Sequence, residues 1–159
     1  MNKKEKGQVS LEFIMILGVF LLIVLTLYPH IQRENEFNKA LASAMDGAIY
    51  AASERGMGYA CETCVKLPSG TIKIINMTLE DRGIDQNGRK AYRIRFYISV
   101  PTYIKDRYPS CYNSPVGISI RRQAIRYIYR AFYGSWNPPN PLEVCTDRYN
   151  FTTTCSYAE

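Results

Sequence analysis

The chain has 159 residues, of which 47% are hydrophobic and 13% aromatic, and its formal net charge is +6. This length suits one small globular domain with one additional element, and the hydrophobic content excludes an intrinsically disordered chain. Three of the lysines lie within the first seven residues, so the net charge is partly local and gives little support for a nucleic-acid partner.

The first predicted element is an apolar helix that follows this short basic stub. No charged residue occurs from Phe13 to Leu27, and the segment from Gln8 to Leu27 has the roughly 20 residues that a helix needs to cross a bilayer. Positive charge beside a membrane span marks its cytoplasmic side. We therefore expect a single-pass segment with the N-terminus in the cytoplasm and the rest of the chain outside.

One carboxylate, Glu12, lies near the start of this segment. A charge at the middle of a bilayer costs about 2.5–3.5 kcal/mol and less near its edge, and the helix dipole favours an acid in the first turn. A plain signal anchor therefore accounts for the length and the lysines but not for Glu12, unless that carboxylate simply reaches back to the headgroups. A secretory signal peptide is disfavoured, because no small-x-small cleavage site follows the apolar run.

The whole stub carries a more specific pattern. Residues 7–13 read Gly-Gln-Val-Ser-Leu-Glu-Phe after a lysine-rich leader, and this string resembles the class III signal peptide of archaeal type IV pilin-like proteins. The resemblance implies that a membrane-bound prepilin peptidase cuts between Gly7 and Gln8 and leaves the apolar helix on the mature protein. It also implies that Glu12 of one subunit pairs with the N-terminal amine of a neighbour.

The resemblance further implies an α+β, type IV pilin-like fold, in which a long N-terminal hydrophobic helix precedes a small antiparallel β-sheet head. Residues 1–7 would be the removed leader, residues 8–59 the long helix and residues 60–159 the extracellular β-rich head. The residues expected to act in assembly are Gln8, Glu12, Phe13 and Pro29.

Within the long helix, residues 8–28 would form the membrane segment and filament core, and residues 30–56 an amphipathic half. Pro29 separates them and predicts a lost hydrogen bond and a kink. Beyond it, apolar residues recur every three or four positions, at Phe37, Leu41, Met45, Ala48 and Ala52, with Ile49 beside them.

The head begins where β-branched and aromatic residues become frequent, and these residues favour strands. Gly70–Leu79 predicts one strand, and Ala91–Val100 alternates cleanly between apolar and polar residues. Asp85–Gly88 between them is a turn signal. The same residues faintly match a calcium loop, but Phe96 replaces the glutamate expected at its twelfth position, so we expect no metal.

The segment Val116–Tyr133 supports two interpretations. Apolar residues alternate on one parity at its start and on the opposite parity later, which predicts a strand with a bulge near residues 121–123. A helix would instead align Arg122, Arg126 and Arg130 in one stripe of like charge, which is unfavourable. We favour the strand because the aromatic content is high. Tyr103–Pro115 and Pro138–Pro141 predict loops.

All five cysteines lie beyond the apolar segment, on the side where disulfides form. The pairs we predict are Cys61–Cys64 and Cys145–Cys155, with Cys111 left over, although spacing alone cannot fix the connectivity. A redox or zinc role for Cys61 and Cys64 lacks a thioredoxin-like context and a second close cysteine pair. Glycosylation sequons occur on the same side at Asn76 and Asn150.

Residues 89–130 hold ten Lys or Arg and a single acid, with tyrosines interleaved. Such a segment can bind DNA, an acidic surface or anionic glycans. We favour the simpler interpretation, in which the arginines form a solvated sheet face or stack on tyrosines within the head. The single histidine, His30, has no evident partner and is expected to be a solvated residue.

No nucleophile motif, phosphate loop or acid–base set is evident, so we expect neither enzymatic activity nor a cofactor. The resemblance implies a structural subunit whose partners are further copies in a homo-oligomeric filament, related pilins, the prepilin peptidase, the assembly machinery and, before assembly, the membrane. Nucleic acid is not expected as a partner. The alternative is a signal-anchored monomeric surface protein whose basic, aromatic head binds a ligand or surface.

Overall fold

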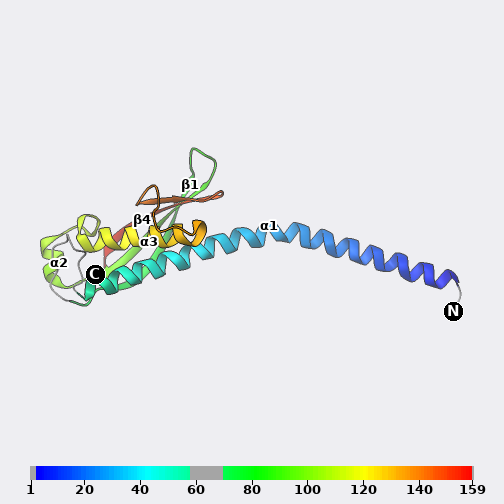
Figure 1. The fold of residues 1–159 in the computed structure, drawn as a ribbon, viewed down its shortest axis with the longest axis horizontal. Helices are drawn as coiled ribbons and strands as arrows, with labels where there is room; N and C mark the ends of the chain where they lie inside the picture. Colours follow the sequence, from blue (N-terminus) through cyan, green and yellow to red (C-terminus); the bar gives the residue numbers. More distant parts are fainter. Residues whose placement is uncertain (1–2, 58–69, 159) are drawn as a thin grey trace. The chain divides into compact units, whose positions relative to one another are not determined.

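A computed structural model describes residues 3–57 and 70–158, with side chains in the first helix from Glu12 onward. The elements in chain order are α1 (Lys3–Gly56), β1 (Lys73–Ile84), β2 (Lys90–Ser99), α2 (Thr102–Arg107), the 3-10 helix η1 (Cys111–Asn113), α3 (Pro115–Tyr133), β3 (Glu143–Cys145) and β4 (Tyr149–Tyr157). A long apolar N-terminal helix followed by a small four-stranded sheet is an α+β layout like that of a type IV pilin (Figure 1). The predicted fold class is therefore confirmed.

The long helix α1 is continuous through Pro29. The chain nevertheless divides into two compact units, residues 1–38 and residues 39–159. The second unit contains the last part of α1 and every other element. The amphipathic part of the helix from Lys39 onward thus belongs to the head.

The sheet has the strand order β1-β2-β4-β3. The outer pairs, β1 with β2 and β3 with β4, are antiparallel, whereas the central pair, β2 with β4, is parallel. The expectation of a wholly antiparallel head is therefore wrong at the centre of the sheet, which is mixed. Parallel neighbours need a long crossover connection, and the chain between β2 and β4 contains α3, the longest element of that connection.

The predicted β1–β2 hairpin is confirmed. On β2, Ile94, Phe96 and Ile98 are fully buried and alternate with partly exposed residues, as the pattern predicted. In the turn, the Asp85 carboxylate accepts hydrogen bonds from the backbone N–H groups of Asn87 and Arg89, each at 2.8 Å. β1 begins and ends later than predicted, at Lys73 and Ile84.

The strand predicted between Val116 and Tyr133 is wrong, because this segment is the helix α3. Its apolar residues also repeat every four positions, and Val116, Ile120, Ala124 and Ile128 are fully buried. The Ser114 hydroxyl accepts a hydrogen bond from the N–H of Gly117 at one end of α3. Gly134, with φ +70°, ends the helix at the other. These caps and the buried stripe outweigh the repulsion between the exposed arginines on the opposite face.

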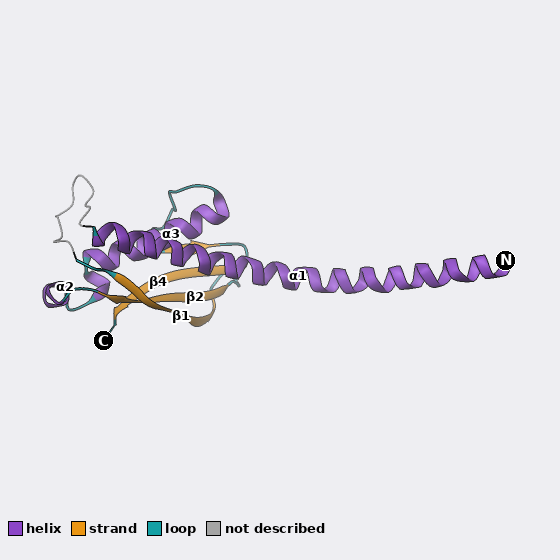
Figure 2. Ribbon diagram, turned by 90° about the horizontal axis from the view of Figure 1, so that it is seen from below, coloured by secondary structure: helices purple, strands orange, loops and turns teal. Residues whose placement is uncertain are grey.

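Within the head, α3 and the part of α1 from Lys39 onward lie on the same side of the sheet (Figure 2). The buried face of this part of α1 is made of small residues: Ala40, Ala44, Ala48 and Ala51 are fully buried. The larger residues expected there lie further out: Leu41 and Met45 are half-buried and Ile49 is 47% exposed.

Gly47 marks the closest approach of the two helices. A Cβ placed on it would lie 2.6 Å from the carbonyl oxygen of Gln123 and 2.9 Å from the Cα of Ala124. The backbones of α1 and α3 therefore touch with no side chain between them, which only a glycine permits.

Two parts of the head differ from the loop predictions. The segment expected as a loop from Tyr103 to Pro115 contains most of α2 and all of η1. The C-terminal tail, for which no strand was predicted, forms β3 and β4, and β4 lies in the middle of the sheet.

Candidate assembly site

The part of α1 from Phe13 to Leu27 exposes a continuous apolar surface. Thirteen large apolar side chains between Phe13 and Leu27 are 42–69% exposed. Fully burying a side chain of this kind contributes about 1.5–3 kcal/mol, so water is a poor environment for this segment. It needs either lipid or the helices of other chains around it.

Among the described residues, α1 is the one helix long and apolar enough to cross a membrane. The mean hydropathy of its best window is 2.4, and none of that window is buried within the chain. A helix that served as the core of a soluble domain would be mostly buried. The segment is thus consistent with a single-pass membrane anchor.

The predicted assembly residues all lie on this helix. Gly7 and Gln8 belong to the helical part of the backbone, but their side chains are outside the described residues. Glu12 and Pro29 are exposed, and Phe13 is 64% exposed. Residues four apart lie about 6 Å apart along a helix axis, so Glu12 and Gln8 share one face, one turn apart.

His30 does have a partner, in contrast to the sequence-based expectation. Its Nε2 lies 3.5 Å from Oε1 of Glu34, one helical turn away, and both side chains are largely exposed. Helical spacing brings such residues together, but an exposed pair of this kind contributes little to stability.

The predicted disulfide between Cys145 and Cys155 is wrong. Cys155 pairs with Cys111, at a Cα–Cα distance of 5.8 Å, and Cys145 is a free thiol. The register explains why: Cys145 lies opposite Asn150, and Cys155 is five residues further along β4, so the two thiols face opposite sides of the sheet. Cys61 and Cys64 lie outside the described residues.

The free thiol of Cys145 is not poised for chemistry. Burial raises its pKa, and the neighbouring carboxylate of Glu143 raises it further. The thiol therefore stays protonated at neutral pH, and the thiolate is the form that reacts.

The two sequons differ in their surroundings. Asn76 is exposed on the edge strand β1, next to a bulge in its pairing with β2. Asn150 is half-buried, and its Nδ2 donates a hydrogen bond to Oε1 of Glu143 at 2.6 Å. The carbonyl oxygen of the Asn150 side chain is buried. Only Asn76 presents its amide to solvent.

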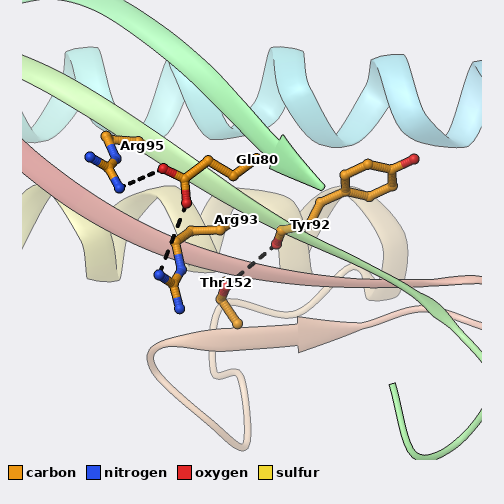
Figure 3. Close-up of polar contacts among 5 residues, drawn as sticks. All are labelled: Glu80, Tyr92, Arg93, Arg95 and Thr152. Carbon is orange, nitrogen blue, oxygen red and sulfur yellow. Dashed lines mark hydrogen bonds and ion pairs between the residues drawn. The ribbon is translucent and has the colours of Figure 1, made fainter. Parts of the chain in front are cut away.

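Several of the clustered arginines are engaged within the head. Glu80 on β1 forms ion pairs with Arg93 and Arg95 on β2 (Figure 3). The guanidinium of Arg121 lies 3.8 Å from the ring centroid of Tyr112, and that of Arg130 lies 4.0 Å from Trp136. The interpretation that arginines stack on tyrosines within the head is confirmed for Arg121, whereas Arg130 stacks on a tryptophan.

No protein-family model, curated protein or solved structure matches the chain.

Proposed function

We propose that this protein is the structural subunit of an archaeal type IV pilus-like surface filament. The observation that carries the proposal is the uncharged apolar segment of α1, which is exposed along its whole length and continuous with a helix that is built into a folded head. The motif in residues 7–13 supports it independently, because a plain anchor needs no such pattern.

Processing and assembly follow from the charges of the N-terminal segment. Cutting between Gly7 and Gln8 removes the three lysines that hold the stub at the cytoplasmic surface. The helix can then leave the membrane for a bundle of identical helices, where its apolar side chains stay out of water. The heads would form the outer surface of the filament.

Glu12 sets the register in this scheme. A carboxylate buried in a helical bundle is costly unless a positive group lies beside it, and the new amine of Gln8 on a neighbouring subunit can supply that charge. Such a pair specifies one axial offset between subunits more than it adds stability.

Intact-mass spectrometry of the protein from its native cells tests the processing step. We expect a polypeptide that begins at Gln8, and a Gly7→Leu variant that keeps residues 1–7. Finding residues 1–7 on the mature wild-type protein would contradict the cleavage.

Assembly is tested by shearing cells and sedimenting the released material. We expect wild-type subunits to leave with the filaments, and Glu12→Ala and Glu12→Gln subunits to stay with the membrane. Glu34→Ala, which removes an acid outside the apolar segment of the same helix, serves as the matched control and is expected to assemble. If wild-type protein itself stays with the membrane as a monomer, the anchored surface protein is the correct alternative.

A further inference from the structure

Arg121 is a charged side chain in the interior of the head. It is 3% exposed on α3, and its Nη2 donates a hydrogen bond to the backbone carbonyl of Tyr112 at 2.8 Å. Across the described residues, no carboxylate forms an ion pair with it. Its Nε and Nη1 also have no hydrogen-bond partner there.

This arrangement is unfavourable for the protein alone. A buried ion without a counter-ion is costly, as is each buried donor without a hydrogen-bond partner, and stacking on the ring of Tyr112 offsets only part of this cost. An anion beside the guanidinium would remove most of this penalty. The uncompensated charge of Arg121 thus favours a negatively charged ligand nearby.

The structure has room for such a ligand. Arg121 lines a cavity of about 350 Å³ at the edge of β4. The short strand β3 pairs only with Asn150–Thr152, so beyond Thr152 no described strand covers this edge of β4. The walls of the cavity include Tyr112, Thr152 and Thr154.

Arg93 provides a second positive charge in the wall of the same cavity. It shares one acid, Glu80, with Arg95, and Arg95 makes the closer contact (Figure 3). The Nη1 of Arg93 lies 4.0 Å from Oε2 of Glu80, so most of its donors are left for another partner. Arg93 and Thr152 are register partners on adjacent strands and point to the same face.

Glu143 is the one acid that lines this cavity. Its two carboxylate oxygens accept hydrogen bonds from the side-chain amides of Asn150, at 2.6 Å, and Asn140, at 3.2 Å. Two arginines against one engaged carboxylate leave the cavity with a net positive charge, which favours an anion.

We infer that this cavity binds an acidic sugar, with the sugar carboxylate beside Arg121 and Arg93. The volume of about 350 Å³ suits a small organic molecule and exceeds what a single inorganic ion fills. The hydroxyl of Thr154 offers hydrogen bonds to the hydroxyl groups of a sugar ring, and the hydroxyl oxygen of Thr152, which donates its proton to the carbonyl of Tyr92, can accept one. The site lies in the head and does not depend on filament assembly.

Calorimetric titration of the full-length protein in detergent with glucuronate tests this inference. We expect saturable binding of glucuronate, at least tenfold weaker binding of neutral glucose, and weaker glucuronate binding at high salt. A glucuronate-containing oligosaccharide, titrated in parallel, distinguishes a free sugar acid from a unit within a polysaccharide.

Two variants locate the site, and one controls for charge. Losing a charge-assisted hydrogen bond weakens binding by roughly tenfold to a hundredfold, so we expect that loss for Arg93→Gln and Arg121→Met. Arg122→Gln removes the same charge one residue away on the exposed face of α3 and is expected to bind normally. The Tm of Arg121→Met without ligand should not fall, because Met fills similar space without an unpaired charge.

Three results would overturn the inference. They are no binding of glucuronate, equal binding of glucuronate, acetate and inorganic phosphate, and normal glucuronate binding by Arg93→Gln. The second result would reduce the cavity to a general anion site. If Arg121→Met does not fold, the glucuronate affinity of Arg93→Gln is the deciding measurement.

Discussion

At the scale of single residues, some side chains of the head accept hydrogen bonds from backbone N–H groups in turns, outside the hydrogen-bonded strands. Asp85 is the clearest case, because its Oδ1 accepts two backbone hydrogen bonds across the β1–β2 turn and its Oδ2 lies 3.5 Å from the amide nitrogen of Asn150. These bonds need the ionised carboxylate. The pKa of Asp85 is accordingly lowered, chiefly by the N–H of Arg89, although partial burial acts in the opposite direction.

This shift predicts an acid-sensitive hairpin. Because the folded pKa of Asp85 is below its ordinary value of 3.8, its contribution to stability is complete above pH 3.8 and is lost as pH falls toward the folded pKa. We expect Asp85→Ala to lower the Tm at pH 7 and to lose this part of the acid sensitivity. Thermal melts between pH 2 and pH 7 measure both, with Asp106→Ala as the control acid on an exposed residue.

The disulfide predicts a second effect of single residues. Cys111 and Cys155 are 44 residues apart, and closing a loop of that length stabilises a fold by about 4 kcal/mol in the chain-entropy model. A Cys111→Ser/Cys155→Ser variant should unfold at markedly lower urea concentration than wild type. Cys145→Ser should melt close to wild type, and an equally large loss there would mean that Cys145 forms the structural bridge.

The sequons give a third prediction at this scale. If the native cells attach glycans to sequons, we expect a glycan on Asn76 and none on Asn150, because the Asn150 amide is held by Glu143 inside the folded head. Peptide mapping by mass spectrometry distinguishes the two sites. Glycan on Asn150 of the folded protein would contradict the described packing.

At the scale of elements, the contact between α1 and α3 explains why alanine and glycine dominate the end of the long helix. Their small side chains let the two backbones approach, so the head buries helix against helix with little side-chain volume. The larger apolar residues of α1, such as Ile49, are consequently left on its outer side.

This contact predicts that Gly47 tolerates no side chain. A Cβ there would meet the backbone of α3, which cannot yield as a flexible side chain can. Overpacking of this kind costs about 1–3 kcal/mol, so Gly47→Ala should lower stability although alanine favours helix. Gly18→Ala, where nothing lies within 4 Å of the added Cβ, is the matched control and should leave the melt of the head unchanged.

The elements that could be predicted from sequence are those in which one pattern dominates. In β2 apolar and polar residues alternate in sequence, and the apolar segment contains no charge from Phe13 to Leu27. In α3, by contrast, the spacing of the apolar residues fits both the two-residue period of a strand and the four-residue spacing of a helix. The signals at its ends, Ser114-Pro115 and Gly134, are those of a helix and distinguish the two.

Other features depend on contacts that no local pattern carries. In β4 the inward position at Thr153 is polar, which obscures the alternation of Tyr149, Phe151 and Cys155. β2 and β4 can pair in parallel because the crossover that includes α3 connects them. A strand predicted in place of α3 therefore gives no indication of this parallel pairing. The cavity at Arg121 unites residues from β2, α3 and β4, and no sequence signal joins them.

For the whole molecule, the division between residues 1–38 and residues 39–159 separates two solvation requirements. The first unit needs an apolar environment, whereas the second buries its own core of Ile94, Phe96, Ile120 and Phe151. The head should therefore fold without the apolar segment.

Deleting residues 1–28 tests this independence. We expect a soluble monomer with cooperative thermal unfolding, because the fully buried apolar side chains among the described residues all lie beyond the deleted part. The full-length chain should need detergent or lipid. Gel filtration and circular dichroism give the readout, and an aggregated or unfolded product would show that the apolar helix contributes to the head.

The Cys111–Cys155 bond also determines how the head responds to a pulling force. If the chain is pulled through α1, the contact of α1 with α3 is loaded first, and β1, an edge strand that pairs with β2, follows it in the chain. Residues between Cys111 and Cys155, including α3 and most of β4, lie within a covalently closed loop and cannot be drawn out in line. We expect a stretched subunit to yield in two stages: α1 and the β1–β2 hairpin separate first, and the closed loop then limits the length that is released.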